Sequence, residues 1–155
     1  MSRQVLTAQP IELSAFARLM RAHSVLRREL ADVLGPRSLT LNDFEAMYHL
    51  SRAEENRLRR IDLAELLMLS PSGVTRLLDG LVEGGLIENV HCADDARVTW
   101  AKLTAEGEST LDCVGVTHTK VMRSLFQGSL DEDEVAQLSE LLGKLPGVGE
   151  GSCSG

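Results

Sequence analysis

Short polar side chains and one guanidinium gather in a single segment of this chain. They belong to Ser70, Ser72, Thr75 and Arg76, and Gly73 stands among them. A guanidinium matches guanine O6 and N7 with two hydrogen bonds, and hydroxyls suit phosphate oxygens and single base contacts. Because Gly73 adds no side chain, the backbone there could approach bases or phosphates closely. The segment therefore predicts sequence-specific contact with double-stranded DNA.

Each of these residues also has a purely structural interpretation. Ser70 would cap a helix in any protein. Arg76 could pair with Asp79 or Glu83 on the same surface. The segment alone leaves both interpretations open, so the elements around it have to be considered.

A second candidate contact lies 20 residues downstream, in a short turn. Arg97 stands at the far end of this turn, after Asp94 and Asp95. A narrow minor groove has an enhanced negative potential that attracts an inserted arginine, and Asp95 could hold Arg97 in place by an ion pair. The alternative is an ordinary surface turn whose Asp–Arg bridge is worth about 0–1 kcal/mol.

Two short helices with a tight break between them would position the first segment. Asp62 is the predicted N-cap of the first helix, with Glu65 completing a capping box. Ser70 caps the second helix, Pro71 takes its first position, and the glycine pair 84–85 ends it. The apolar residues that would lock the crossing angle are Leu63, Ala64, Leu66, Leu67, Val74, Leu77, Leu78 and Leu81. This is the pattern of a helix-turn-helix, whose second helix enters the major groove.

Further elements surround this pair. Residues 86–92 and 98–103 are β-like and are joined by the turn 93–97, which predicts a hairpin, and 58–61 could hold a short strand. Apolar periodicity and caps predict four longer helices. They span 11–34, from Thr40 (with Asp43) to about Ala53, from Thr104 to about Phe126, and from Asp131 (with Glu134) to about Leu145. The predicted fold is mainly α with a small β-hairpin, a winged helix-turn-helix with flanking helices.

Composition sets limits on function. The 155 residues suit one domain, and no apolar run or N-terminal signal suggests a membrane or secretory route, so we expect a cytoplasmic protein.

The net charge is −7, which opposes DNA binding, but residues 129–150 hold six acids against one lysine. Residues 52–60 hold four arginines against two glutamates. Since DNA senses the field within about 8–10 Å, an acidic C-terminal helix that points away from the duplex would remove the conflict.

Cysteines and histidines show no spacing typical of a metal site, and no cofactor is predicted. For Cys92 and Cys113 a small buried thiol is favoured over an oxidant sensor. Cys153 stands in a Gly/Ser-rich tail, 146–155, which we expect to be flexible. No phosphate loop, zinc motif or nucleophile–base set is found, so an enzyme is not expected.

The runs "IDLAELLMLSPSGVTRLLDGLVEGGLIENV" and "DDARVTWAKLTAEG" resemble the MarR family of bacterial transcription regulators. The second run carries the wing signature of that family: Asp95, Arg97, Leu103, Thr104 and Gly107. The resemblance covers about residues 11–145. Two positions depart from it, because Asn89 follows Glu88 where the family often has arginine, and Ala96 replaces the usual second basic residue of the wing. Binding would then depend more on Arg76, Arg97 and the arginines of 57–60.

The resemblance implies a homodimer that binds an inverted repeat, with half-sites about 34–36 Å apart. It divides one domain, 1–155, into dimerisation helices (11–34 and 104–145) and a DNA-binding lobe (40–103). Many members of the family are repressors that release DNA when a small phenolic or aromatic acid binds between the dimer helices and the lobe.

Candidate cations or donors for such an effector are Arg18, His23 and His49, unless they are ordinary solvated or hydrogen-bonded side chains. Two rival functions remain: a winged helix used for protein–protein contact, which would show an apolar open face on 71–84, and a thiol-based redox-sensing regulator.

Overall fold

The computed structural model describes residues 10–91 and 98–148. Its helices are α1 (Ile11–Leu34), α2 (Leu41–Arg52), α3 (Arg60–Leu66), α4 (Pro71–Glu83), α5 (Ala105–Gln127) and α6 (Glu132–Gly143), with short 3-10 turns at Gly35–Arg37 and Glu54–Asn56. Its strands are β1 (Arg57–Arg59), β2 (Ile87–His91) and β3 (Thr99–Leu103). In the part of the chain described, no helix is both long enough and apolar enough to cross a membrane.

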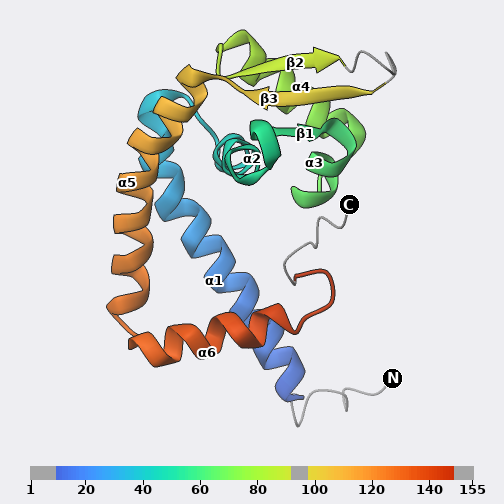
Figure 1. The fold of residues 1–155 in the computed structure, drawn as a ribbon. Helices are drawn as coiled ribbons and strands as arrows, with labels where there is room; N and C mark the ends of the chain where they lie inside the picture. The colour runs from blue at the N-terminus through green and yellow to red at the C-terminus, as the bar shows by residue number, and fades with distance from the viewer. Residues whose placement is uncertain (1–9, 92–97, 149–155) are drawn as a thin grey trace, which may run out of the picture.

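The chain forms a lobe with long helices extending from it. Figure 1 shows α2, α3, α4 and the sheet at one end, while α1 and α5 run away from them and α6 lies at the far end. The three strands are antiparallel in the order β1-β3-β2, so the predicted hairpin is confirmed, and β1 adds a third strand to it. This is the expected winged helix-turn-helix, mainly α with a small sheet.

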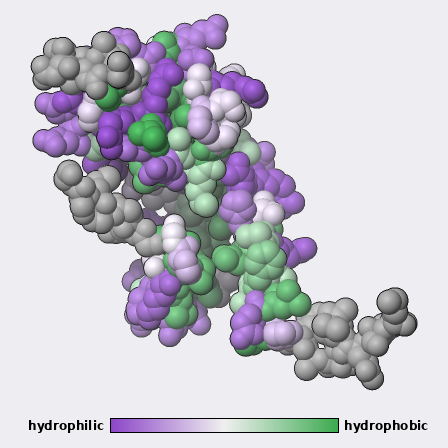
Figure 2. Space-filling view, turned by 90° about the vertical axis from the view of Figure 1, so that its right-hand side faces the viewer, coloured by the Kyte–Doolittle hydropathy of each residue, from purple (hydrophilic) through white to green (hydrophobic). Residues whose placement is uncertain are grey.

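The hydrophobic core lies inside the lobe. Its fully buried members include Met47 and Leu50 of α2, Leu63 of α3 and Leu78 of α4. By contrast, α1 buries only Leu30 and Leu34 near its C-terminal end, and α6 buries no side chain. Figure 2 shows hydrophobic side chains over these extended helices, whereas the lobe's surface is largely hydrophilic. The extended helices therefore have apolar faces that one copy of the chain leaves uncovered.

Local capping chemistry decides where most helices begin. Thr40 with Asp43 and Asp131 with Glu134 each form a complete capping box, as predicted. Thr104 caps α5 by accepting a hydrogen bond from the Gly107 amide. The last helix ends at Gly143, two residues before the expected end.

The predicted N-cap of α3 is wrong. The helix begins at Arg60, its N-cap is Arg59, and no side chain caps it. Arg59 pairs with Trp100 in the sheet, which keeps its backbone extended up to the first helical residue. Asp62 consequently lies inside the first turn of α3, where its carboxylate accepts two hydrogen bonds from the Arg59 guanidinium, of 2.7 and 2.8 Å. The expected strand at 58–61 is likewise shifted to 57–59.

Candidate nucleic-acid interface

Helix α4 presents one apolar and one polar face. Val74, Leu78 and Leu81 are buried in the core. On the other side Ser70, Ser72, Thr75 and Arg76 are exposed. The helix therefore offers hydroxyls and a guanidinium to solvent from its N-terminal half, where unpaired backbone N–H groups also favour an anion.

The start of α4 is built as the sequence predicts. Ser70 is the N-cap and accepts a 3.1 Å hydrogen bond from the Gly73 amide, and Pro71 takes the first helical position. The Thr75 hydroxyl donates to the Pro71 carbonyl oxygen over 2.9 Å, so its oxygen remains free to accept a hydrogen bond. The hydroxyls of Ser70 and Ser72 lie 3.2 Å apart.

The local geometry explains why glycine stands at position 73. A Cβ atom at this position would lie 3.2 Å from Ser70 Oγ and 3.7 Å from Leu69 Cβ. Such a contact is tight, so a side chain would push against the N-cap hydroxyl. The predicted approach of the Gly73 backbone to DNA stays a prediction beside this explanation.

Arg76 carries an uncompensated charge. Within residues 10–91 and 98–148, no carboxylate oxygen lies within 4.0 Å of its guanidinium. The alternative in which Asp79 or Glu83 neutralises it is therefore not what the structure shows, because Asp79 faces Arg60 instead, at 3.8 Å. Arg76 is available for an external acceptor.

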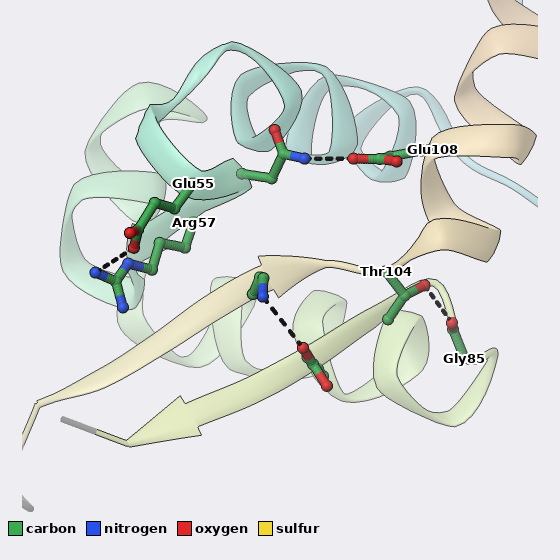
Figure 3. Close-up of polar contacts among 8 residues, drawn as sticks. Glu55, Arg57, Gly85, Thr104 and Glu108 are labelled. Atoms are coloured by element: carbon green, nitrogen blue, oxygen red, sulfur yellow. Dashed lines mark hydrogen bonds and ion pairs between the residues drawn. The ribbon is translucent and has the colours of Figure 1, made fainter. Parts of the chain in front are cut away.

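Three of the four arginines in segment 52–60 lie beside carboxylates, which the sequence did not indicate. Arg57 pairs with Glu55 (Figure 3). Its guanidinium also lies over the Trp100 ring, 5.1 Å from the ring centroid. Arg59 pairs with Asp62, whose hydrogen bonds and charge raise the pKa of the guanidinium. The predicted local excess of positive charge is therefore smaller at the surface than a residue count suggests.

The end of α4 is fastened to the start of α5. The Leu86 amide donates to the Leu81 carbonyl oxygen, and Gly85 has φ +72°, a conformation that favours glycine. Thr104 Oγ1 then donates to the Gly85 carbonyl oxygen over 2.7 Å (Figure 3). At Gly107 a Cβ atom would lie 2.1 Å from the Leu86 carbonyl oxygen, so only glycine fits. This close contact explains why the Leu-Thr-x-x-Gly run ends in glycine.

Two of the predicted DNA contacts cannot be placed. Asp95 and Arg97 lie outside the described residues, as does Cys92. The structure describes the base of the hairpin, where β2 and β3 pair from Ile87 opposite Leu103 to His91 opposite Thr99.

A cleft of about 960 Å³ lies beside the lobe. Its lining comes from α1, α2 and α5 and includes Leu30, Leu41, Phe44, Tyr48, Leu111, His118, Lys120, Met122 and Arg123. His118 stacks on Phe44 with ring centroids 4.2 Å apart, and burial lowers the pKa of its imidazole. The cleft combines aromatic and apolar walls with two cationic side chains, Lys120 and Arg123, and two carboxylates, Glu45 and Asp112.

The predicted effector residues do not line this cleft. Arg18 and His23 are exposed on α1, and His49 is half-buried on α2 with its ring beside Tyr48. The prediction overlooked His118, Lys120 and Arg123. A usable signal was present, since Leu111, Gly115, His118 and Met122 recur at three- and four-residue spacing and so share one face of α5.

The expectation of a small buried thiol is wrong for Cys113. Its side chain is exposed on α5, and the Arg37 guanidinium donates to its sulfur over 2.8 Å. The buried residues of α5 are Gly107, Thr110, Leu111 and Val114. Position 113 stands two residues after Leu111 and one before Val114, so at about 100° per residue it lies on the flank of this buried face.

Comparison with known proteins gives a consistent result. The MarR family's sequence profile matches residues 37–98. The HTH-type transcriptional regulator YhbI of Bacillus subtilis (strain 168), itself uncharacterised, is 31% identical over 128 residues, which cover 83% of this chain and 80% of that protein.

Solved structures agree in fold. AbsC, a MarR family transcriptional regulator from Streptomyces coelicolor, superposes with a TM-score of 0.78 at 28% identity, covering 87% of this chain and 91% of its own. A mutant of E. coli MarR in complex with operator DNA gives a TM-score of 0.74 at 25% identity, covering 88% of this chain and 96% of its own.

Proposed function

Since this chain belongs to the MarR family of winged-helix transcriptional regulators, we propose that it is a ligand-responsive repressor that binds an inverted-repeat DNA site as a homodimer. The observation that carries the proposal is the exposed N-terminal half of α4, where Arg76 has no carboxylate partner among the described residues. The E. coli MarR complex with operator DNA supports the same use of the fold.

The proposed DNA contacts divide between two grooves. In the major groove Arg76 reads a guanine with two hydrogen bonds, because its guanidinium is exposed and unpaired. The remaining proposed contacts from α4 are Ser70, Ser72, Gly73 and Thr75, which bind phosphate oxygens and single base atoms. In the minor groove Arg97, held by Asp95, inserts from the wing.

The homodimer follows from the uncovered apolar faces. On α1 the exposed fractions of Ile11 and Phe16 are 77% and 59%, and on α6 that of Leu141 is 54%. Apolar side chains grouped in this way are stabilised by a second copy that covers them. Two copies joined through α1, α5 and α6 would hold their α4 helices at a fixed separation.

The arrangement also explains how an acidic chain can bind DNA. Glu132, Asp133 and Glu134 stand at the start of α6, and Figure 1 shows α6 at the opposite end of the molecule from α4. At physiological ionic strength their field is screened within about 8–10 Å. The net charge of −7 therefore says little about the potential at α4.

The cleft between α1, α2 and α5 is the proposed effector site. A small aromatic or phenolic acid would stack near Phe44 and His118 and pair with Lys120 or Arg123. These side chains take the place of Arg18, His23 and His49 in the proposal. Because the cleft touches both the lobe and the extended helices, a ligand there can favour one arrangement of the two over another.

The rival functions have weaker support. A protein–protein module would need an apolar open face on α4, whereas the exposed face carries hydroxyls and a guanidinium. Among the described residues, a thiol-based sensor would rest on Cys113 and its Arg37 neighbour. One cysteine with one cation does not by itself define a sensor, so the ligand-responsive proposal is preferred.

Selection of bound duplexes from a random DNA pool tests the proposal. The full chain should enrich an inverted repeat whose half-sites lie about one helical turn apart. Repeating the selection with a panel of aromatic acids should release the DNA with at least one of them. Enrichment of no common sequence would refute the DNA-binding proposal, and an unchanged affinity with every acid would refute the effector proposal alone.

A further inference from the structure

Arg60 connects three elements of the lobe. It is the first residue of α3, and its Nη2 atom lies 3.2 Å from Asn89 Oδ1 on β2 and 3.8 Å from Asp79 Oδ1 on α4. Its side chain is only 27% exposed, and its Nε atom is buried without a partner among the described residues. The guanidinium thus lies between the candidate DNA-reading helix and the first strand of the wing.

The contact with Arg60 fixes which way the Asn89 amide faces. A guanidinium has donors and no acceptor, so the Asn89 atom that faces it must be the oxygen. The two amide atoms diverge from the same carbon, and the Nδ2 donors are therefore directed away from Arg60. Asn89 is exposed on β2, which leaves this amino group available to an external acceptor.

The neighbouring arginines do not share this role. Arg57 pairs with Glu55 and Arg59 pairs with Asp62, both within three residues in sequence. Their ion pairs stabilise the turn and the helix start locally. Among the described arginines of this segment, Arg60 is the one whose contacts reach both α4 and β2.

Taking the proposed DNA-binding function as its basis, we propose that Asn89 donates a hydrogen bond to the DNA backbone, and that Arg60 is the positioning residue that orients it. Phosphate oxygens are acceptors, and such contacts fix the register of a protein on the duplex without reading sequence. By holding β2 against α4, Arg60 would also set the distance between the groove that α4 reads and the groove that the wing reaches.

A double-mutant cycle on DNA affinity tests this inference. The full chain and its variants Asn89→Ala, Arg60→Ala, Arg60→Lys and the double Asn89→Ala/Arg60→Ala are titrated on the selected duplex and on a scrambled duplex at several salt concentrations. Arg59→Ala is the matched control, because it removes an arginine one residue away that does not contact β2. Thermal unfolding of each variant shows whether it is folded.

The expected result has three parts. Asn89→Ala weakens binding about tenfold or more per half-site, the worth of one hydrogen bond to a charged acceptor, and does so equally on both duplexes. Arg60→Ala weakens binding at least as much, and adding Asn89→Ala to it has little further effect. Arg60→Lys retains the charge but not the planar fork of donors. Its DNA affinity should therefore lie between that of the wild type and that of Arg60→Ala.

Independent, multiplying losses for Arg60→Ala and Asn89→Ala would overturn the positioning role, as would a loss for Arg60→Ala no larger than that for Arg59→Ala. Undiminished affinity in Asn89→Ala would overturn the backbone contact. These outcomes are separable from failure of the proposed function, in which the wild-type chain itself would select no DNA site.

Discussion

Thr104 Oγ1 donates a hydrogen bond to the Gly85 carbonyl oxygen over 2.7 Å and accepts one from the Gly107 amide over 3.0 Å. One hydroxyl therefore caps α5 and fastens it to the end of α4. Since α5 carries part of the proposed effector cleft and α4 carries the proposed DNA contacts, this hydroxyl connects the two proposed sites. The close approach at Gly107 makes this junction stiff.

Replacing Gly107 with alanine should strongly destabilise the protein. The new Cβ atom would lie 2.1 Å from the Leu86 carbonyl oxygen and 2.7 Å from Leu103 Cδ1. We expect a loss of about 2–3 kcal/mol in the free energy of unfolding, measured by urea denaturation. Gly115→Ala is the matched control in the same helix, where nothing lies within 4 Å of the added atom. It should gain about 0.5–1 kcal/mol from helix propensity, and equal losses in the two variants would contradict the steric argument.

Replacing Met68 with glycine or asparagine should stabilise the protein. Met68 is in the turn between α3 and α4 with φ 52°, and it is 89% exposed. A side chain in the left-handed region costs about 1–2 kcal/mol, and little buried surface would be lost. We expect a gain of about 1 kcal/mol in chemical denaturation. Met68→Val should be less stable than the wild type, since a β-branched residue tolerates this conformation poorly. If Met68→Val were instead the more stable protein, the backbone at position 68 would not be strained.

His118 should make stability depend on pH. Burial lowers the pKa of its imidazole below the ordinary value of 6.5, so the unfolded chain takes up this proton more readily than the folded one. The stability contribution is therefore complete above pH 6.5 and is lost as the pH falls through the lowered folded pKa. His118→Gln should flatten this part of the stability curve. If stability changes with pH in His118→Gln as it does in the wild type, the pH dependence does not come from His118.

Arg76 should determine discrimination between DNA sequences. Arg76→Ala removes an exposed guanidinium with no ion-pair partner in the described part of the chain, so folding stability should hardly change. We expect a loss of about 1–3 kcal/mol on the selected site and relaxed preference at one base step, measured by titration on single-base variants. Arg28→Ala, which removes a charge from α1, should not affect base preference. Equal losses on specific and random duplexes would show that Arg76 contacts phosphate only.

Phe16 should contribute to the proposed dimer interface. Phe16→Asp places a charge on an apolar face of α1, and two-fold symmetry repeats the change in both copies. With about 1.5–3 kcal/mol per buried side chain, the dissociation constant should rise at least 100-fold, measured by sedimentation equilibrium. Ile61→Asp is the control, because Ile61 is similarly exposed but lies on α3 in the lobe. A Phe16→Asp variant that remains as associated as the wild type would exclude this face from the interface.

Elements with local signals could be predicted from the residues alone. The caps at Thr40, Ser70, Thr104 and Asp131 act within three residues of themselves, and the hairpin follows from two short β-like runs around a turn. Their chemistry depends little on the rest of the chain, which is why the order of helices and strands could be predicted with most boundaries correct to two residues.

Which charges remain unpaired, and which distant side chains meet, depends on how the elements pack in three dimensions. Asp62 lost its capping role because β1 pairs with β3 and holds Arg59 extended. The arginines of 57–60 are neutralised by partners on a turn, on α3 and on α4. The cleft that brings Phe44 to His118 joins positions 74 residues apart. Such contacts depend on how helices and strands pack against each other, and no spacing within one segment contains that information.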